Sequence, residues 1–188
     1  DYGSQRPLSA SWTVTGSGAF ALGLNQKCRA HITGMTPGRI VDYGLKDSMN
    51  MGACMAPAAA DTVARHMEDF HVTPEEYDRI ITGDLGSVGQ TVLIDLLREK
   101  GIDIADRHMD CGIEIFDAEA QDTHAGGSGC GCSAVTLAAY VLPKLESGEW
   151  KKVLFLPTGA LLSKTSFNEG KSVPGIAHAV VLESPAVK

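Results

Sequence analysis

Helical spacing of apolar residues marks three segments of the chain. Along residues 56–70, the small and apolar side chains of Ala59, Val63, Met67 and Phe70 fall on one side. The other two segments each end at a glycine, which is typical of helix C-termini. The predicted helices are 56–70, 88–101 and 130–147, and the capping box Thr73-Pro74-Glu75-Glu76 predicts one further short turn.

Short apolar runs that are bounded by glycine, proline or charged residues predict the strands. These runs are 11–24, 28–45 with a break at Pro37-Gly38, 77–85, 151–163 and 173–184. Residues 106–117 are polar and irregular, and no element is assigned to them. The alternation of strands and helices predicts an α/β fold, with a mixed or parallel sheet flanked by helices.

In sheets of this kind, ligands gather beyond the carboxyl ends of the strands. Three loops that contain glycine are predicted at that edge: GDLGS (83–87), AGGSGC (125–130) and PTGALLS (157–163). We therefore expect these loops to converge on one site.

The 188 residues are 44% hydrophobic and 21% charged, which is ordinary for one globular domain or for half of a larger protein. A net charge of −7 argues against nucleic acid and against electrostatic docking on anionic lipid. No run approaches the roughly 18 to 20 consecutive apolar residues of a membrane span, and no signal peptide is recognisable. Because the chain opens on Asp1 and not on Met, we expect a piece of a longer protein.

Five cysteines at irregular spacing, in a chain without an export signal, indicate reduced thiols and no disulfide frame. Cys130 and Cys132 form neither a CxxC pair nor half of a four-ligand set, so no metal site is predicted there. At a helix start they are either reactive thiols or small residues that allow close packing, and we favour packing. The segment DRHMDCG (106–112) also lacks the spacing of a metal site, and a polar surface loop is predicted.

Four motifs, in order along nearly the whole chain, resemble those of the thiolase superfamily. They are MGACMAPAAADTVARHM (51–67), DRIITGDLGSVG (78–89), HAGGSGCGCSA (124–134) and VLFLPTGALLS (153–163). The resemblance implies a duplicated fold, in which residues 1–24 hold the last strands of the first half and residues 25–188 form the second half. That second half would be a mixed five-stranded sheet with helices packed on it. A weak echo between VTGSGAFALG near the start and PGIAHAVVLE near the end agrees with a duplication.

The residues at the catalytic positions that this resemblance implies differ from those of the enzymes. Thiolase-type catalysis uses a nucleophilic Cys from the first half, and second-half groups that stabilise an oxyanion and move protons. Here the second-half positions hold Asp84, Gly126-Gly127-Ser128 and Leu156-Pro157-Thr158-Gly159. An ionised carboxylate accepts hydrogen bonds and repels an oxyanion, so we expect a binding protein with no catalytic residues. The alternative is an active acyltransferase or ketoacyl synthase that uses a Cys of the first half.

Within the superfamily, five short motifs resemble those of the stage V sporulation AD family. They are TGSGA, MAPAAADT, TGDL, AGGSGCGCSA and TGALLS. The resemblance implies that the chain binds dipicolinic acid, free or as its Ca²⁺ chelate, and supports its uptake into the developing spore. The implied partners are membrane proteins of the same sporulation operon, and the implied location is the forespore or spore, peripheral to the inner membrane. Thiolase-like proteins commonly pair, which implies a homodimer. No cofactor and no resident metal are implied.

The ligand is expected at the glycine-rich loop, because glycines allow close approach and a helix N-terminus attracts anions. The predicted ligand-binding residues are Asp84, His124, Gly126, Gly127, Ser128, Gly129, Cys130, Thr158 and Gly159. His124 either donates to a ligand carboxylate or lies in solvent. Asp84 is unfavourable beside a dianion unless it is protonated, bonded to a neighbour or bridged by Ca²⁺, and the sequence leaves these three open. A third hypothesis is a purely structural partner of a membrane complex that binds no small molecule.

Overall fold

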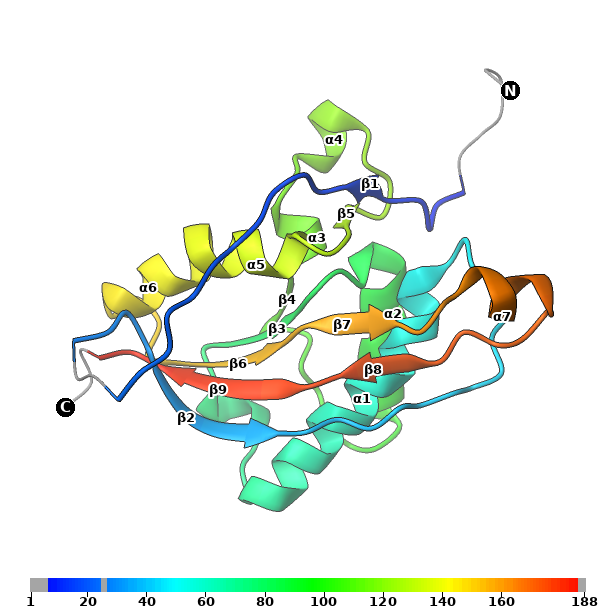
Figure 1. The fold of residues 1–188 in the computed structure, drawn as a ribbon. Helices are drawn as coiled ribbons and strands as arrows, with labels where there is room; N and C mark the ends of the chain where they lie inside the picture. Colours follow the sequence, from blue (N-terminus) through cyan, green and yellow to red (C-terminus); the bar gives the residue numbers. More distant parts are fainter. Residues whose placement is uncertain (1–6, 25–26, 186–188) are drawn as a thin grey trace.

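A five-stranded mixed sheet between two layers of helices forms the body of the molecule (Figure 1). The computed structural model describes residues 7–24 and 27–185. In the order in which they lie side by side, the strands are β2 (His31–Thr36), β9 (Ala179–Glu183), β6 (Lys152–Leu156), β3 (Arg79–Thr82) and β4 (His108–Asp110). Strands β6, β3 and β4 run parallel, and β9 runs antiparallel to both of its neighbours. The predicted mixed sheet with helices packed on it is confirmed.

Helices cover both faces of this sheet (Figure 1). They are α1 (Met51–Phe70) and α2 (Gly86–Arg98) on one face, and on the other face a continuous run of α5 (Cys132–Thr136), a π-helical turn (Leu137–Val141) and α6 (Leu142–Glu146). Leu154 and Leu156 of β6 pack with α1 and α2, whereas Val153 and Phe155 pack on the opposite side, because neighbouring strand residues point to opposite faces. Burial on both faces explains why the central strands are continuous apolar runs.

The remaining elements are short and lie around the sheet. They are β1 (Trp12–Thr13) paired with β5 (Gly127–Ser128), β7 (Thr158–Ala160) paired with β8 (Gly175–Ala177), the 3₁₀ turn Pro74–Glu76, and the helices α3 (Cys111–Glu114), α4 (Ala118–Gln121) and α7 (Lys164–Asn168). Within the described residues, no helix combines the length and apolar character that crossing a membrane requires.

The three predicted helices are confirmed, with shifted ends. Helix α1 begins at Met51, earlier than the predicted start at residue 56, because the Asn50 side chain caps it by accepting a hydrogen bond from the Ala53 N–H at 3.3 Å. This earlier start brings the first turn of α1 to the edge of the sheet where the predicted loops lie.

The prediction of an extended strand over residues 11–24 is wrong for most of the segment. Only Trp12–Thr13 pairs with another strand, and the following residues cross over helix α5. Glycines allow this close crossing, since a Cβ added at Gly18 would lie 2.9 Å from the Cβ of Ala134. The segment therefore packs against a helix where a sheet was expected.

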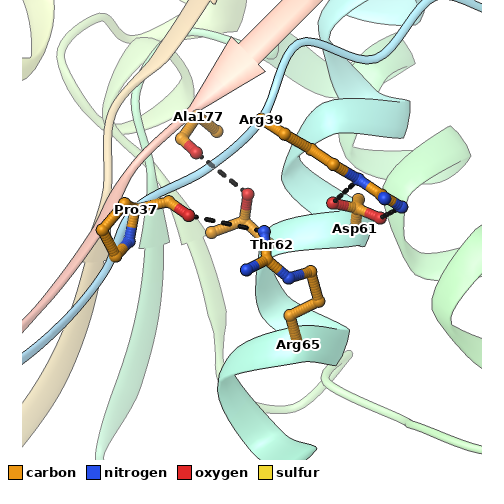
Figure 2. A network of polar contacts seen from close by, with 6 residues as sticks. All are labelled: Pro37, Arg39, Asp61, Thr62, Arg65 and Ala177. Carbon is orange, nitrogen blue, oxygen red and sulfur yellow. Dashed lines mark hydrogen bonds and ion pairs between the residues drawn. The ribbon is translucent and has the colours of Figure 1, made fainter. Parts of the chain in front are cut away.

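A polar network fastens the segment after β2 to helix α1 (Figure 2). The Arg39 guanidinium donates to both carboxylate oxygens of Asp61, at 2.9 and 2.5 Å, and Arg65 donates to the carbonyl of Pro37 at 3.4 Å. Thr62, which is buried, donates to the carbonyl of Ala177 at 2.9 Å. Because Arg39 is largely exposed, its ion pair adds little stability and serves mainly to fix the path of the chain.

One buried chain of side-chain hydrogen bonds ties β2 to α1 and to the start of β3. His66 is fully buried, with its Nδ1 at 2.7 Å from the Thr36 hydroxyl and its Nε2 at 2.6 Å from the Tyr77 hydroxyl. Burial lowers the pKa of His66, and the nearby charge of Lys152 lowers it further. The imidazole is therefore neutral near pH 7 and uses one nitrogen as donor and the other as acceptor.

We expect Tyr77→Phe to lower the free energy of unfolding by about 1 to 3 kcal/mol, because it leaves a buried His66 nitrogen without its partner. The matched control is Tyr43→Phe, which removes the same hydroxyl from a side chain that is 62% exposed. Urea denaturation of both variants is the measurement. Equal losses of stability in the two variants would contradict the role assigned to the buried hydroxyl.

Candidate functional site

The three predicted loops meet at the carboxyl ends of β3 and β6. These strands are parallel neighbours, with Thr82 beside Leu156, so the loops that follow them leave the sheet at one edge. The glycine-rich segment that enters α5 lies against the same edge, and together the loops line a cavity of about 690 Å³. The convergence predicted from the sequence is thus present in the structure.

Apolar side chains, hydroxyl groups and backbone line this cavity, which we call the Asp84 pocket. Its lining comprises Ser9, Ser11, Phe20, Met51, Gly52, Met55, Asp84, Leu85, Gly86, Ala125, Ser128, Gly129, Cys130, Ser133, Ala134, Leu137, Phe155, Pro157, Thr158, Gly159 and Ala160. Within this lining, Asp84 is the single charged side chain, and neither an imidazole nor a side-chain amide is present.

The Asp84 side chain joins all three loops. Its Oδ2 accepts a hydrogen bond from the Gly129 N–H at 2.9 Å, and its Oδ1 accepts one from the Thr158 hydroxyl at 3.1 Å. The Thr158 oxygen accepts in turn from the Asp84 N–H at 3.3 Å. Burial raises the pKa of Asp84, as does the nearby charge of Asp110, while the hydrogen bonds from Gly129 and Thr158 lower it. Of the three states left open by the sequence, the structure shows the one in which Asp84 is bonded to its neighbours.

A second carboxylate, that of Asp110, lies beneath the pocket and is almost fully buried. Its Oδ2 accepts from the Leu85 N–H at 2.9 Å and from the Thr82 hydroxyl at 2.7 Å. Its Oδ1 accepts from the N–H groups of Gly86 at 3.1 Å and Gly112 at 3.0 Å. Asp110 therefore caps the starts of both α2 and α3 and fixes the loop that carries Asp84.

His108 completes this buried network. Because Thr82 gives its single hydroxyl proton to Asp110, its oxygen accepts from His108 Nε2 at 2.9 Å. The Gln90 amide then donates to His108 Nδ1 at 2.8 Å. Burial lowers the pKa of His108 from 6.5 to about 4, so the ring is neutral near pH 7.

The prediction of a polar surface loop over residues 106–112 is therefore wrong. His108 and Asp110 belong to strand β4 and face inward, where their polar groups satisfy one another and the backbone. Within the described part of the chain, no group of three or more His, Cys, Asp or Glu residues is placed to hold a metal ion.

The two cysteines of the glycine-rich segment lie in different surroundings. Cys132 is buried, donates weakly to the Gly83 carbonyl at 3.6 Å, and has its pKa raised to about 12 by burial. Cys130 is exposed and lines the Asp84 pocket. The interpretation as closely packed small residues therefore holds for the buried Cys132 but not for the exposed Cys130. The tightest packing is at Gly131 between them, where an added Cβ would lie 2.3 Å from the Gly16 carbonyl oxygen.

Three of the predicted ligand-binding residues lie outside the pocket lining. His124, with φ of 53°, donates through Nδ1 to the Pro7 carbonyl at 3.1 Å and holds the N-terminal segment. Gly126 packs closely on Gly112, and Gly127 pairs with Trp12. The other six predicted residues line the pocket: Asp84, Ser128, Gly129, Cys130, Thr158 and Gly159.

Several lining residues escape the sequence prediction. Met51, Gly52 and Met55 lie in the first turns of α1. They belong to the motif that begins MGACM, which is the sequence feature that could have placed them at the pocket. Ser9 and Ser11 belong to the N-terminal segment, and nothing in their local sequence marks them. The Ser11 and Ser128 hydroxyls are 2.6 Å apart at the pocket rim, which joins the N-terminal segment to the glycine-rich loop.

Comparison with known proteins gives a family match over most of the chain. Residues 1–183 match the model of the family described as Stage V sporulation protein AD (SpoVAD). The stage V sporulation protein AD of Bacillus subtilis (strain 168) is 43% identical over 183 residues, which are 97% of this chain and 54% of that protein. The chain thus spans about half the length of the curated relative that it matches.

Two solved structures show a weaker likeness at 15% sequence identity each. The crystal structure of human mitochondrial 3-ketoacyl-CoA thiolase gives a TM-score of 0.43 over 83% of this chain and 30% of that chain. The structure of 3-oxoacyl-[acyl-carrier-protein] synthase III from Aquifex aeolicus VF5 gives a TM-score of 0.44 over 84% of this chain and 46% of that chain.

We expect Asp110→Asn to lower the free energy of unfolding by about 2 to 4 kcal/mol, because an amide NH₂ would face backbone donors that now share a carboxylate. Asp117→Asn is the matched control, since Asp117 caps α4 at an exposed site and Asn caps about as well as Asp. Chemical denaturation of both variants measures the difference. A loss in Asp110→Asn as small as that in the control would contradict the network.

Acidification should destabilise the fold through His108. The folded-state pKa is lowered to about 4, below the ordinary 6.5, so the unfolded chain binds a proton that the folded chain does not. The stability present above pH 6.5 should therefore fall between pH 6.5 and 4, by roughly 1 to 3 kcal/mol. Denaturation at several pH values should show a flatter slope for His108→Asn. The control His71→Asn, at an exposed left-handed position, should keep the wild-type slope, and equal slopes in all three proteins would refute the assignment.

Proposed function

The chain belongs to the stage V sporulation protein AD family, and from this premise we propose that the Asp84 pocket binds dipicolinic acid, a small aromatic dicarboxylate. Family membership supports a role in sporulation. The proposal goes further, since it gives the protein a ligand, free or as its Ca²⁺ chelate, and a part in the uptake of that ligand into the developing spore.

The observation that carries the proposal is the convergence of the three loops on one cavity. About 690 Å³ is within the range of small-molecule sites and leaves ample room for a pyridine ring with two carboxylates. The Gly129 N–H and the Thr158 hydroxyl are carboxylate donors within the pocket, and the hydroxyls of Ser11 and Ser128 lie at its rim. Apolar side chains such as Phe155 supply a wall for the aromatic ring.

The composition of the pocket favours binding over acyl transfer. An oxyanion intermediate needs preorganised donors, yet the pocket's one charged group is the Asp84 carboxylate, an acceptor that repels negative charge. The lining also offers no imidazole to move protons. We therefore propose a non-catalytic member of its superfamily, with the exposed Cys130 as a wall residue and not a nucleophile.

The cellular setting is also part of the proposal. We propose that the protein works in the forespore or spore, peripheral to the inner membrane, beside membrane proteins of the same sporulation operon. In this arrangement the membrane proteins move the ligand, and the Asp84 pocket collects or presents it. A homodimer is the proposed assembly.

A larger hollow of about 1090 Å³ adjoins the Asp84 pocket, with which it shares Phe20 and Leu137, and lies between residues 19–24, the helical run and strands β2 and β9. Its walls are mostly apolar, and Leu22 in the segment beside it is 81% exposed. We propose that residues 1–24 are the end of a first half, as the family resemblance implies, although among their described residues Trp12–Thr13 alone forms a strand. We propose that this half packs there against residues 25–188. Residues 1–6, 25–26 and 186–188 of this division lie outside the described residues. We assign ligand binding to the smaller Asp84 pocket because it contains the carboxylate donors.

Calorimetric titration of dipicolinate, with and without Ca²⁺, into the full natural polypeptide that contains this chain tests the proposed function. We expect saturable binding, weakened at least about tenfold by Cys130→Trp, which places an indole in the pocket. The matched control is Glu68→Trp, at an exposed position near the other end of α1, which should bind as the wild type does. No heat from a protein shown to be folded, or equal binding by both tryptophan variants, would contradict the proposal. Turnover of a coenzyme A thioester would favour the acyltransferase alternative.

A further inference from the structure

The two best carboxylate donors in the Asp84 pocket already hold a carboxylate. The Gly129 N–H and the Thr158 hydroxyl both donate to Asp84, at 2.9 and 3.1 Å, one to each oxygen. A backbone N–H and a hydroxyl that each bond one oxygen of a carboxylate form the arrangement in which a ligand carboxylate would be expected to bind. Asp84 therefore occupies the pocket as a tethered internal ligand.

No cation compensates for a second negative charge in this pocket. Its lining contains neither Lys nor Arg, so a ligand carboxylate near Asp84 would face uncompensated repulsion. Asp110, at the end of β4, adds a second negative charge beside Asp84. Cys132 at the start of α5 and Cys111 in α3 also lie near Asp84, but burial raises the pKa of both thiols, so they stay neutral and supply no positive charge. A dicarboxylate and an ionised, bonded Asp84 are therefore poor neighbours.

We propose that Asp84 is an autoinhibitory competitor of the ligand, whose carboxylate must leave the Gly129 N–H and the Thr158 hydroxyl before a ligand carboxylate takes its place. This inference rests on the proposed function, since it concerns the regulation of the same pocket. The Asp84 side chain is only partly buried and lies at the pocket wall, so rotation about its side-chain bonds carries the charge away without moving β3. The Asp110 network meanwhile keeps the backbone of the 83–87 loop in place.

The competition has a signature that a direct ligand contact or a Ca²⁺ bridge would not share. Every ligand carboxylate that uses these two donors must first displace Asp84. Removing the Asp84 carboxylate by mutation should therefore strengthen the binding of monocarboxylates and dicarboxylates alike. If Asp84 instead contacted the ligand or held its Ca²⁺, removing it would weaken binding. The sign of the change therefore separates the two arrangements.

The test is calorimetric titration of dipicolinate and of picolinate, its monocarboxylate analogue, into the full natural polypeptide and three variants. Asp84→Ala frees both donors and should bind each ligand at least about tenfold more tightly, with dipicolinate gaining at least as much as picolinate. Asp84→Asn removes the charge but leaves an oxygen for the Gly129 N–H, so its affinity should lie between those of the wild type and Asp84→Ala. Asp61→Ala removes a carboxylate from the distant ion pair of Figure 2 and should bind as the wild type does.

The outcomes distinguish this inference from the proposed function. If the wild type binds dipicolinate and Asp84→Ala binds it equally or more weakly, the competition is overturned, while the proposed binding of dipicolinate stands. No binding by the wild type or any variant overturns both. Thermal melting of each variant shows whether it is folded. If Asp84→Ala does not fold, Asp84→Asn is the deciding variant. Tighter binding by Asp84→Asn than by the wild type supports the competition, and equal or weaker binding overturns it.

Discussion

The buried carboxylate of Asp110 is the contact on which the rest of the site depends. Hydrogen bonds from Thr82, Leu85, Gly86 and Gly112 converge on it, so one side chain joins the ends of β3 and β4 to the starts of α2 and α3. A buried charge of this kind is stable only when its acceptor sites are satisfied, which makes the loop geometry around it strongly determined. The loop that presents Asp84 is therefore a rigid part of the structure.

From this fixed base, the Asp84 pocket forms where parallel strands end and a glycine-rich segment starts a helix. The second carboxylate, that of Asp84, joins the three loops through Gly129 and Thr158 and bonds the two donors to which we assign a ligand carboxylate. These contacts of Asp84 hold the three loops together. They also explain why a second carboxylate is difficult to place in the pocket. In the proposed arrangement, one interaction both supports the loops and inhibits ligand binding.

Much of the fold is predictable from the sequence, because short apolar runs locate the central strands, and apolar spacing with glycine stops locates the three helices. The short strand β4 is not, since the residues His108-Met109-Asp110 carry no apolar pattern and are buried through hydrogen bonds to Thr82 and Gln90. The burial of such polar residues depends on partners that are distant in the sequence, so no local sequence pattern predicts it. His124 is a different case: its place beside the glycine-rich loop predicts a ligand contact, whereas in the structure its side chain bonds the carbonyl of Pro7 and lies outside the pocket lining. The distant residues Ser9 and Ser11 reach the pocket through that same N-terminal segment.

The most direct test of the account is a crystal structure of the full natural polypeptide with dipicolinate bound. The account predicts a ligand carboxylate on the Gly129 N–H and the Thr158 hydroxyl, with the Asp84 side chain turned away from both and the Asp110 network unchanged. A ligand bound outside this pocket would contradict the assignment of the site. A ligand inside it with Asp84 still bonded to Gly129 would contradict the competition between the two carboxylates.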